Sequence, residues 1–435
     1  MTYKINKMKK ILPGIVAILI LLIAVTSSCT NNLQKEERPQ QLEPAVPESV
    51  GFSSERLACI DSVVNDYINR ECFPGAVALI ARHGRIVYHK SFGMRDPAIQ
   101  DAMQPDDIFR IASMTKALTS VAVMMLYEEG HFLLDDPVSK YIPEFKKPQV
   151  LIKLNPDTTY IARPAVREIT IRHLLTHTSG IGYPFIHSEI RPLYEKHGIP
   201  DGFVITDAIL KNAIPALGTL PLLHDPGERY TYGLNTDVLG YFVEVISGQS
   251  FDDFLKERLF IPLGMEDACF YLPDEKADRL VPVYASNDQG FEPSDEPLYN
   301  YPFTGGKSYF SGGAGISCTI LDYARFMQMM VNEGSYNGHQ VLGRKTIDLM
   351  TMNQVGNLYG DGGFGLGFGL VTDGNKHQIL SSVGNYSWGG YFSTTFWMDP
   401  QEDLIALFYT QMFPMYYGEI HNKFQVLTYQ ALIGE

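Results

Sequence analysis

The first regular part of the chain has apolar residues at helical spacing, followed by two apolar runs typical of strands. In "SSERLACIDSVVNDYIN", residues 53–69, five side chains fall along one helical face: Leu57, Ile60, Val63, Val64 and Tyr67. The runs "GAVALIARHG" and "RIVYHKSFG" then meet at His83-Gly84, a pair that suits a tight turn. The pattern predicts a helix and then a β-hairpin.

The rest of the chain divides into a helical middle and a strand-rich end. A long, mostly apolar helix is expected to end near Gly130, and helical patterns with loops continue to about residue 345. After residue 360, "FGLGFGLVTD", "SWGGYFSTTFWMDP" and "DLIALFYTQM" read as strands, and "HNKFQVLTYQALIG" as a last helix. These elements predict an α/β (α+β) fold: an antiparallel sheet flanked by helices, formed from both chain ends (about 49–110 and 345–435). A helical subdomain (about 111–344) is inserted between them.

The amino terminus is predicted to be an export signal, residues 1–28. Four lysines precede the apolar run "ILPGIVAILILLIAV", and the small residues "TSSC" end at Cys29. A cysteine at that place resembles the lipobox of bacterial lipoproteins, in which it receives the lipid. An ordinary secretory signal with an incidental cysteine is the alternative. The polar stretch at 29–48 is expected to be a flexible tether. The expected location is the bacterial cell envelope, with membrane attachment only through Cys29.

Composition and charge reduce the number of function classes that the chain can have. The 435 residues are 45% hydrophobic and 19% charged, with a formal net charge of −14. Lysine and arginine form no block outside the first ten residues, so a nucleic-acid partner is not expected. Cys59, Cys72, Cys269 and Cys318 show no CxxC spacing, and no metal or organic cofactor is predicted. Whether Cys59 and Cys72 form a disulfide is left open, as is the oligomeric state.

The candidate chemistry begins with "FRIASMTKALTSVAVMML", in which Ser113 and Lys116 stand three positions apart. On a helix these two side chains share a face and can touch. The surrounding apolar residues indicate burial, which disfavours an ammonium and favours the neutral, proton-accepting amine. A neutral amine beside a hydroxyl is a nucleophile with its base. A capping serine followed by a solvent-reaching lysine is the structural alternative.

A second motif supports the chemical interpretation. "YTYGLNTDVLGYFVEVISG" places Tyr232 directly before a predicted helix, with Asn235 or Thr236 as its cap. A tyrosine fixed on such a turn can act as a general acid or base beside the Ser-Lys pair.

Together these motifs resemble the serine β-lactamase and penicillin-binding protein superfamily, and within it the esterase-like branch near class C β-lactamases. The resemblance runs from about residue 50 to 430. It is carried by "FRIASMTK", "ITIRHLLTHTSGI", "YTYGLNTDVLG", "PLGMEDACF", "GGAGIS" with "DYARFMQMM", and "WGGYFSTTFWMDP".

The resemblance implies a role for each matched residue. Ser113 is similar to the acylated serine, Lys116 to its lysine and Tyr232 to the tyrosine of the family's Y-x-N element, whose third position is here Leu234. Trp388-Gly389-Gly390 stands where the family has K-T-G, so these three residues are expected to contact substrate. The N–H groups of Ser113 and Tyr391 are then expected to bind the oxyanion.

The predicted function is a serine hydrolase acting through an acyl-enzyme on Ser113, with uncharged esters or small amides as substrates. A β-lactamase, a D-alanyl-D-alanine carboxypeptidase and an envelope binding protein with an inactive site are the alternatives. His173 and His177 are interpreted as packing and hydrogen-bonding residues, because the Ser-Lys pair leaves no need for a histidine base.

Overall fold

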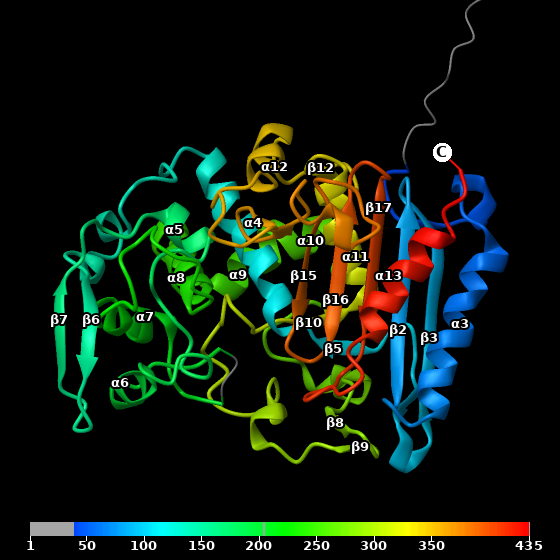
Figure 1. Cartoon of the computed structure of the whole chain (residues 1–435), viewed down its shortest axis with the longest axis horizontal. Coiled ribbons are helices and arrows are strands. Elements are labelled where there is room, and N and C mark those ends of the chain that lie inside the picture. The colour runs from blue at the N-terminus through cyan, green and yellow to red at the C-terminus, as the bar shows by residue number, and fades with distance from the viewer. Residues whose placement is uncertain (1–38, 203–204, 435) are drawn as a thin grey trace, which may run out of the picture. The chain divides into compact units, whose positions relative to one another are not determined.

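The structure is a computed structural model that describes residues 39–202 and 205–434 (Figure 1). Its main sheet has nine strands, in the order β1-β3-β2-β17-β16-β15-β14-β13, with β4 paired to β3. All neighbours in it are antiparallel except β1 and β3, which are parallel. The bounds of these strands are β1 Glu43–Pro44, β2 Gly75–Arg82, β3 Arg85–Asp96, β4 Asp101–Ala102, β13 Gly363–Phe364, β14 Gly369–Leu370, β15 Tyr386–Gly390, β16 Thr394–Asp399 and β17 Leu404–Tyr409.

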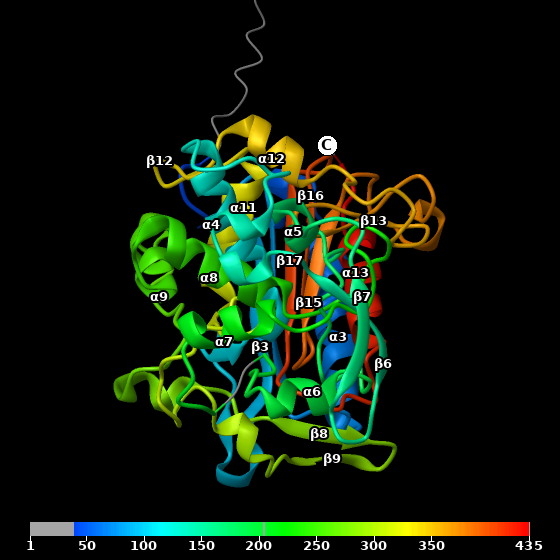
Figure 2. The same cartoon turned by 90° about the vertical axis from the view of Figure 1, so that its left-hand side faces the viewer.

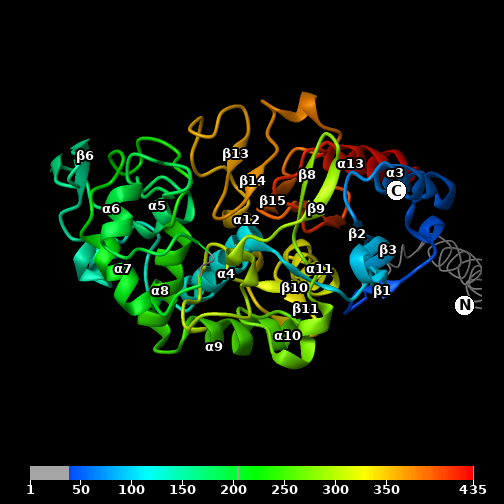
Figure 3. The same cartoon turned by 90° about the horizontal axis from the view of Figure 1, so that it is seen from below.

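The centre of the sheet is buried on both faces because helices cover each side. On one face, Ala78 of β2 and Phe408 of β17 pack with α3 (Ser54–Asn69) and α13 (Ile420–Gln430). On the other, Leu79 and Leu407 face the larger core that includes α11 (Ile320–Val331). Successive strand residues point to opposite faces, so a strand between two layers must be apolar at every position. Figure 3 shows α3 and α13 side by side on one side of β2, with α11 on the other.

The inserted part carries most of the remaining helices and faces the viewer in Figure 2. Its helices are α4 Thr115–Glu128, α5 Ile171–Leu175, α6 Arg191–Lys196, α7 Leu210–Gly218, α8 Asn235–Ser247, α9 Phe251–Leu255, α10 Ile261–Leu263 and, at its end, α12 Arg344–Met350. Four two-stranded ribbons accompany them: β5 Ile108–Arg110 with β10 Ser317–Thr319, β6 Gln149–Leu154 with β7 Tyr160–Pro164, β8 Tyr284–Asn287 with β9 Gly290–Pro293, and β11 Ser335–Tyr336 with β12 His339–Gln340.

The predicted fold class is confirmed, and so is the hairpin between β2 and β3. His83 (φ 54°) and Gly84 (φ 74°) both adopt the left-handed conformation that a two-residue turn between twisted strands requires. Helix α3 buries Leu57, Ile60 and Val64, as its spacing predicted.

Two details differ from the sequence-based expectations. Neither Asn235 nor Thr236 caps α8: the N-cap residue is Leu234, with no side-chain hydrogen bond, because Asn235 is buried in other contacts. Strand β1 lies within the predicted tether and pairs with β3, so ordered structure begins before residue 49. Cys29 and the rest of the predicted signal lie outside the described residues.

No disulfide forms among the four cysteines of the described residues. Cys59, Cys72, Cys269 and Cys318 are all free thiols; Cys59 is exposed on α3 and Cys72 is buried. No helix within residues 39–202 and 205–434 is long and apolar enough to cross a membrane.

Candidate active site

Ser113 lies in a tight turn, Ala112–Met114, between β5 and α4. From Ile111 to Leu126 every residue is buried except Ser113, which is partly exposed. Ala112, directly before it, has a φ of 41°, a left-handed conformation that costs a non-glycine residue energy. The turn therefore presents one hydroxyl at the surface of an otherwise buried segment.

Several long-range contacts hold this turn in place. The Gln411 side chain accepts from the Arg110 N–H (3.1 Å) and donates to the Arg110 carbonyl (3.1 Å), which fixes the end of β5. Tyr323 of α11 donates its hydroxyl proton to the Met114 carbonyl (2.9 Å), and Ile316 N–H donates to Thr115 Oγ1 (3.1 Å). Because these partners come from two distant parts of the chain, 316–323 and Gln411, the position of Ser113 is set by the whole fold.

Lys116 is 2% exposed and reaches back to Ser113. Its Nζ lies 3.2 Å from Ser113 Oγ and donates to the Gly313 carbonyl at 2.6 Å. The same nitrogen lies 4.5 Å from the centre of the Tyr232 ring and 5.2 Å from that of the Tyr183 ring. Lys116 therefore does not extend to solvent. The alternative of a capping serine followed by a solvent-reaching lysine is wrong.

The carbonyl partner of Lys116 belongs to the glycine-rich segment 311–315, "SGGAG". Ser311 Oγ donates to Asp237 Oδ1 of α8 (2.7 Å), and Thr119 Oγ1 of α4 donates to the Gly312 carbonyl (2.7 Å). A Cβ on Gly313 would lie 2.6 Å from both Asp237 Oδ2 and the Tyr183 hydroxyl, so glycine is required there.

Asp237 is a buried carboxyl beside this lysine. It is fully inaccessible, and its Oδ2 has no hydrogen-bond partner among the described residues. Burial raises the pKa of Asp237 to about 6, while the hydrogen bond from Ser311 and the charge of Lys116 act in the opposite direction.

Tyr232 is held by the block "THTSGI", residues 176–181. The Thr231 N–H donates to the His177 carbonyl (2.7 Å), and a Cβ on Gly233 would lie 2.0 Å from the Ile181 carbonyl. The ring of Tyr232 lies 4.9 Å from that of His177. In the described part of the chain the Tyr232 hydroxyl has no hydrogen bond, and Lys116 Nζ lies over the Tyr232 ring.

His177 is a packing and hydrogen-bonding residue, as expected. Its Nδ1 lies 3.0 Å from the side-chain nitrogen of Asn235, which donates to it. Burial, and then the charge of Lys116, hold the pKa of His177 well below its usual value, so the ring is neutral. His173 pairs with Thr170 at the start of α5 in a capping box.

Strand β15 forms the opposite side of the site. A Cβ on Gly390 would lie 2.5 Å from the Ile111 carbonyl, so the glycine lets β15 approach the Ser113 turn closely. Trp388, on the same strand, has its ring 5.7 Å from Tyr232 and 5.4 Å from Phe364. A Cβ on Gly389 would meet only the Thr394 carbonyl, at 3.2 Å. Tyr391 follows directly, and its ring stacks on Phe413 at 3.7 Å.

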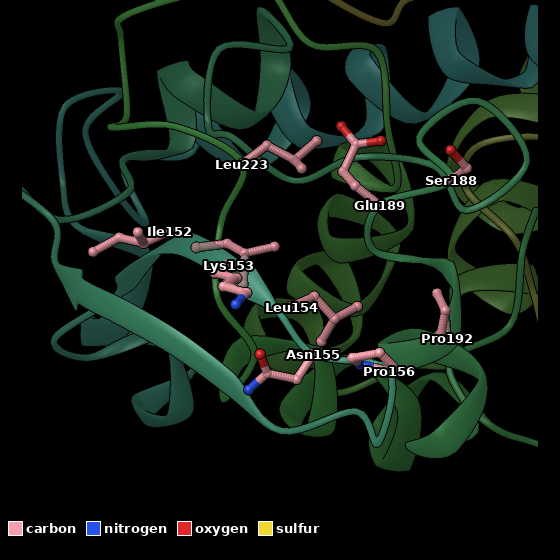
Figure 4. A pocket seen from close by; sticks show the side chains of 10 residues that line it. Ile152, Lys153, Leu154, Asn155, Pro156, Ser188, Glu189, Pro192 and Leu223 are labelled. Atoms are coloured by element: carbon pink, nitrogen blue, oxygen red, sulfur yellow. The ribbon is translucent and has the colours of Figure 1, made fainter.

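A surface pocket of about 500 Å³ lies elsewhere, between β6 and the segment 188–192 (Figure 4). Leu223, which lines the pocket, donates its N–H to the Gly180 carbonyl. The pocket therefore adjoins the block 176–181 that holds Tyr232. None of the predicted site residues lines it.

The structure thus brings Ser113, Lys116, Tyr232 and Trp388 into one site, with Gly390 and Tyr391 beside the serine turn. Sequence reasoning missed Gly313, Asp237 and Tyr183. The glycines of "GGAGIS" were a visible signal, but nothing local in the sequence pointed to a carbonyl acceptor for a lysine 197 residues away. In the described part of the chain, no group of three or more His, Cys, Asp or Glu residues could hold a metal ion.

The class of protein follows from three features. Ser113 lies on a turn before a buried helix, Lys116 lies one helical turn further, and strand β15 packs closely against the serine turn. These features are typical of a β-lactamase/transpeptidase-like serine enzyme. The chain belongs to the Beta-lactamase family, whose family model matches residues 60–429. It is 30% identical over 383 residues to Esterase EstB of Burkholderia gladioli, covering 84% of this chain and 93% of that protein.

Solved structures with the same fold support this assignment. EstCE1, a hydrolase with promiscuous acyltransferase activity, superposes with a TM-score of 0.73 at 26% identity, covering 86% of this chain and 99% of that one. Simvastatin synthase (LovD) of Aspergillus terreus gives 0.75 at 23% identity, over 88% and 100% of the two chains, and supports the fold alone. The protein is therefore a serine hydrolase of the β-lactamase family.

Proposed function

We propose that the protein hydrolyses uncharged esters or small amides through a covalent acyl-enzyme on Ser113. The observation that carries the proposal is the 3.2 Å approach of the buried Lys116 Nζ to Ser113 Oγ. Lys116 takes the serine proton as the oxygen attacks the carbonyl carbon, and the Ser113 and Tyr391 N–H groups hold the oxyanion. Collapse expels the leaving group, which receives its proton from Tyr232 or Lys116. Water then attacks the acyl-enzyme and releases the acid.

The substrate class rests on Trp388. Where β-lactamases and D-alanyl peptidases have the lysine and threonine of K-T-G, this chain has an indole and Gly389. A substrate carboxylate moved there from water would lose hydration without gaining a paired charge. A neutral ester loses little and gains contact with the ring. Uncharged esters are therefore favoured over penicillins, cephalosporins and D-alanyl peptides.

Acyl transfer to an alcohol is a second candidate. The rings of Tyr232, Trp388 and Phe364 form an apolar wall beside the lysine, and an apolar alcohol can bind there in place of water. EstCE1 is a hydrolase with promiscuous acyltransferase activity, which supports the candidate.

The test is labelling with a fluorophosphonate together with turnover of p-nitrophenyl esters and nitrocefin. Wild type should label and hydrolyse esters, and Ser113→Ala should do neither while keeping its melting temperature. Labelling that persists in Ser113→Ala would place the nucleophile elsewhere. A protein that neither labels nor turns over any ester would be an inactive binding protein. Nitrocefin hydrolysis faster than that of the best ester would refute the substrate class.

We also propose that the chain is an exported lipoprotein anchored through Cys29. The proposal is supported by the basic residues, the apolar run and the small residues that precede this cysteine in the sequence.

A further inference from the structure

A continuous series of aromatic rings leads from Lys116 to the outside of the site. The Tyr183 ring lies 5.2 Å from Lys116 Nζ and 4.9 Å from the Phe185 ring. Phe185 is 6.3 Å from Tyr391 in an edge-to-face arrangement, and Tyr391 stacks on Phe413. We call Phe185, Tyr391 and Phe413 the aromatic mouth. Its place beside the serine turn follows from Gly390, which precedes Tyr391 and touches the Ile111 carbonyl.

Phe185 is the exposed member of the mouth, with 48% of its surface open to solvent. Its backbone is nevertheless fixed. Arg191 Nε donates to the neighbouring Pro184 carbonyl at 3.0 Å, and the Ile186 N–H donates to the Tyr183 carbonyl at 3.1 Å. His187 Nδ1 accepts from the Tyr183 N–H at 3.1 Å. A large ring that is half exposed on a fixed turn binds an apolar group with little loss of conformational freedom.

The opposite side of the mouth is equally well defined. Tyr391 interacts through its hydroxyl with Tyr299, and burial raises the pKa of the Tyr391 phenol, so this ring is uncharged. Tyr299 in turn packs edge-to-face on Phe392, at 5.2 Å. Arg110, the last residue of β5, donates to the Tyr299 carbonyl at 2.6 Å, which ties the support of the mouth to the strand that precedes the Ser113 turn.

We propose that the aromatic mouth is the specificity-determining surface of the enzyme and that Phe185 selects esters carrying an aryl or extended alkyl substituent. This inference rests on the proposed function. A phenyl or hexyl group laid on the exposed part of the Phe185 ring covers apolar surface that water otherwise contacts, while an acetyl or methyl group leaves it exposed. The half-buried Asp201 carboxyl near Phe185 disfavours an anionic substituent at the same place.

The experiment compares substrates with the substituent on either side of the ester bond. One series holds the alcohol as p-nitrophenol and varies the acyl group through acetate, hexanoate and phenylacetate. The other holds the acyl group as acetate and varies the alcohol through methyl, hexyl and benzyl, followed by pH-stat. Phe185→Ala should lower kcat/KM for the large substituents about tenfold and leave the smallest ester within about twofold. The series that changes shows which side of the ester occupies the mouth.

Two further variants test whether the effect comes from the Phe185 ring itself. Phe185→Leu retains apolar bulk without a ring, so it should keep hexyl selectivity and lose aryl selectivity. Tyr160→Ala is the matched control, because Tyr160 is a 38% exposed aromatic residue of β7, the strand at the left edge of the fold in Figure 1. Equal losses on every ester in Phe185→Ala, unchanged selectivity in both series, or the same change in Tyr160→Ala would overturn the inference.

Binding measured without turnover separates this inference from the proposed function. In the Ser113→Ala background, calorimetry should show methyl phenylacetate binding about tenfold more tightly than methyl acetate, and adding Phe185→Ala should remove the difference. Ester hydrolysis with no such preference would overturn the inference alone. A preference in binding without hydrolysis by wild type would overturn the proposed function and leave the mouth in place.

Discussion

Gly313→Ala perturbs the acceptor of the Lys116 hydrogen bond without altering Ser113, Lys116 or Tyr232. The new Cβ would lie 2.6 Å from Asp237 Oδ2, 2.6 Å from the Tyr183 hydroxyl and 3.1 Å from Thr236 Oγ1. Real Cβ contacts do not come this close, and all three neighbours are buried, so the segment 311–315 must move. That movement displaces the Gly313 carbonyl from Lys116 Nζ, now 2.6 Å away.

The expected loss follows from this hydrogen bond. As Lys116 takes the serine proton it becomes charged, and a hydrogen bond from a charged group contributes about 1.5–3 kcal/mol, so its loss corresponds to roughly a ten- to hundredfold fall in kcat. KM should change by no more than about threefold, because no contact with the bound ester is removed. Crowding of the core should also lower the free energy of unfolding by about 1–3 kcal/mol.

The assay is steady-state hydrolysis of the best p-nitrophenyl ester, with urea unfolding on the same samples. Gly418→Ala is the matched control, since its Cβ would meet nothing within 4 Å and its backbone is not left-handed. In a Lys116→Ala background, Gly313→Ala should add little, because the carbonyl then has no partner to position. A folded Gly313→Ala protein with wild-type kcat, or full additivity with Lys116→Ala, would refute the reasoning.

Three further predictions concern single groups. Tyr232→Phe should leave a folded protein whose kcat is lower by about a hundredfold or more, the scale of lost proton transfer, and wild-type rates would remove Tyr232 from the mechanism. Asp237 has its folded pKa raised from 3.8 to about 6, so the stability it contributes at low pH is lost as pH rises through 6. Between pH 4 and pH 8 wild type should therefore lose roughly 2–3 kcal/mol of unfolding free energy relative to Asp237→Asn, measured by urea titration; parallel pH dependences would contradict this. Cys29→Ser should move the protein from the membrane fraction to the soluble envelope fraction, and a wild-type protein already soluble without detergent would contradict the lipid anchor.

Residues with a strong local signal were predictable from the sequence. The His83-Gly84 turn follows from two residues that tolerate positive φ between two apolar runs, and α3 from the spacing of Leu57, Ile60 and Val64. The contact between Ser113 and Lys116 also follows locally, because three residues in a helical turn bring two side chains to the same face.

The failed prediction of a cap on α8 shows where local rules stop. Asn235 has the right chemistry for an N-cap, but its side chain accepts a hydrogen bond from Ser179 and donates to His177 Nδ1. These partners lie 56 and 58 residues earlier in the chain, so only the folded chain reveals the competition. Propensity describes what a residue can do, and tertiary contacts decide which option is used.

The sequence by itself determined the first helix and hairpin, the strand-rich end with its last helix, and the Ser-Lys pair. Each of these depends on side-chain periodicity over a few residues. Only the tertiary structure decided that Gly313 receives the Lys116 hydrogen bond, that Asp237 is buried beside it, and that the Phe185 ring packs edge-to-face against Tyr391. Such groups converge from distant segments only when the sheet and the helical part pack together. Their chemistry comes from burial and close approach, which no short stretch of sequence encodes.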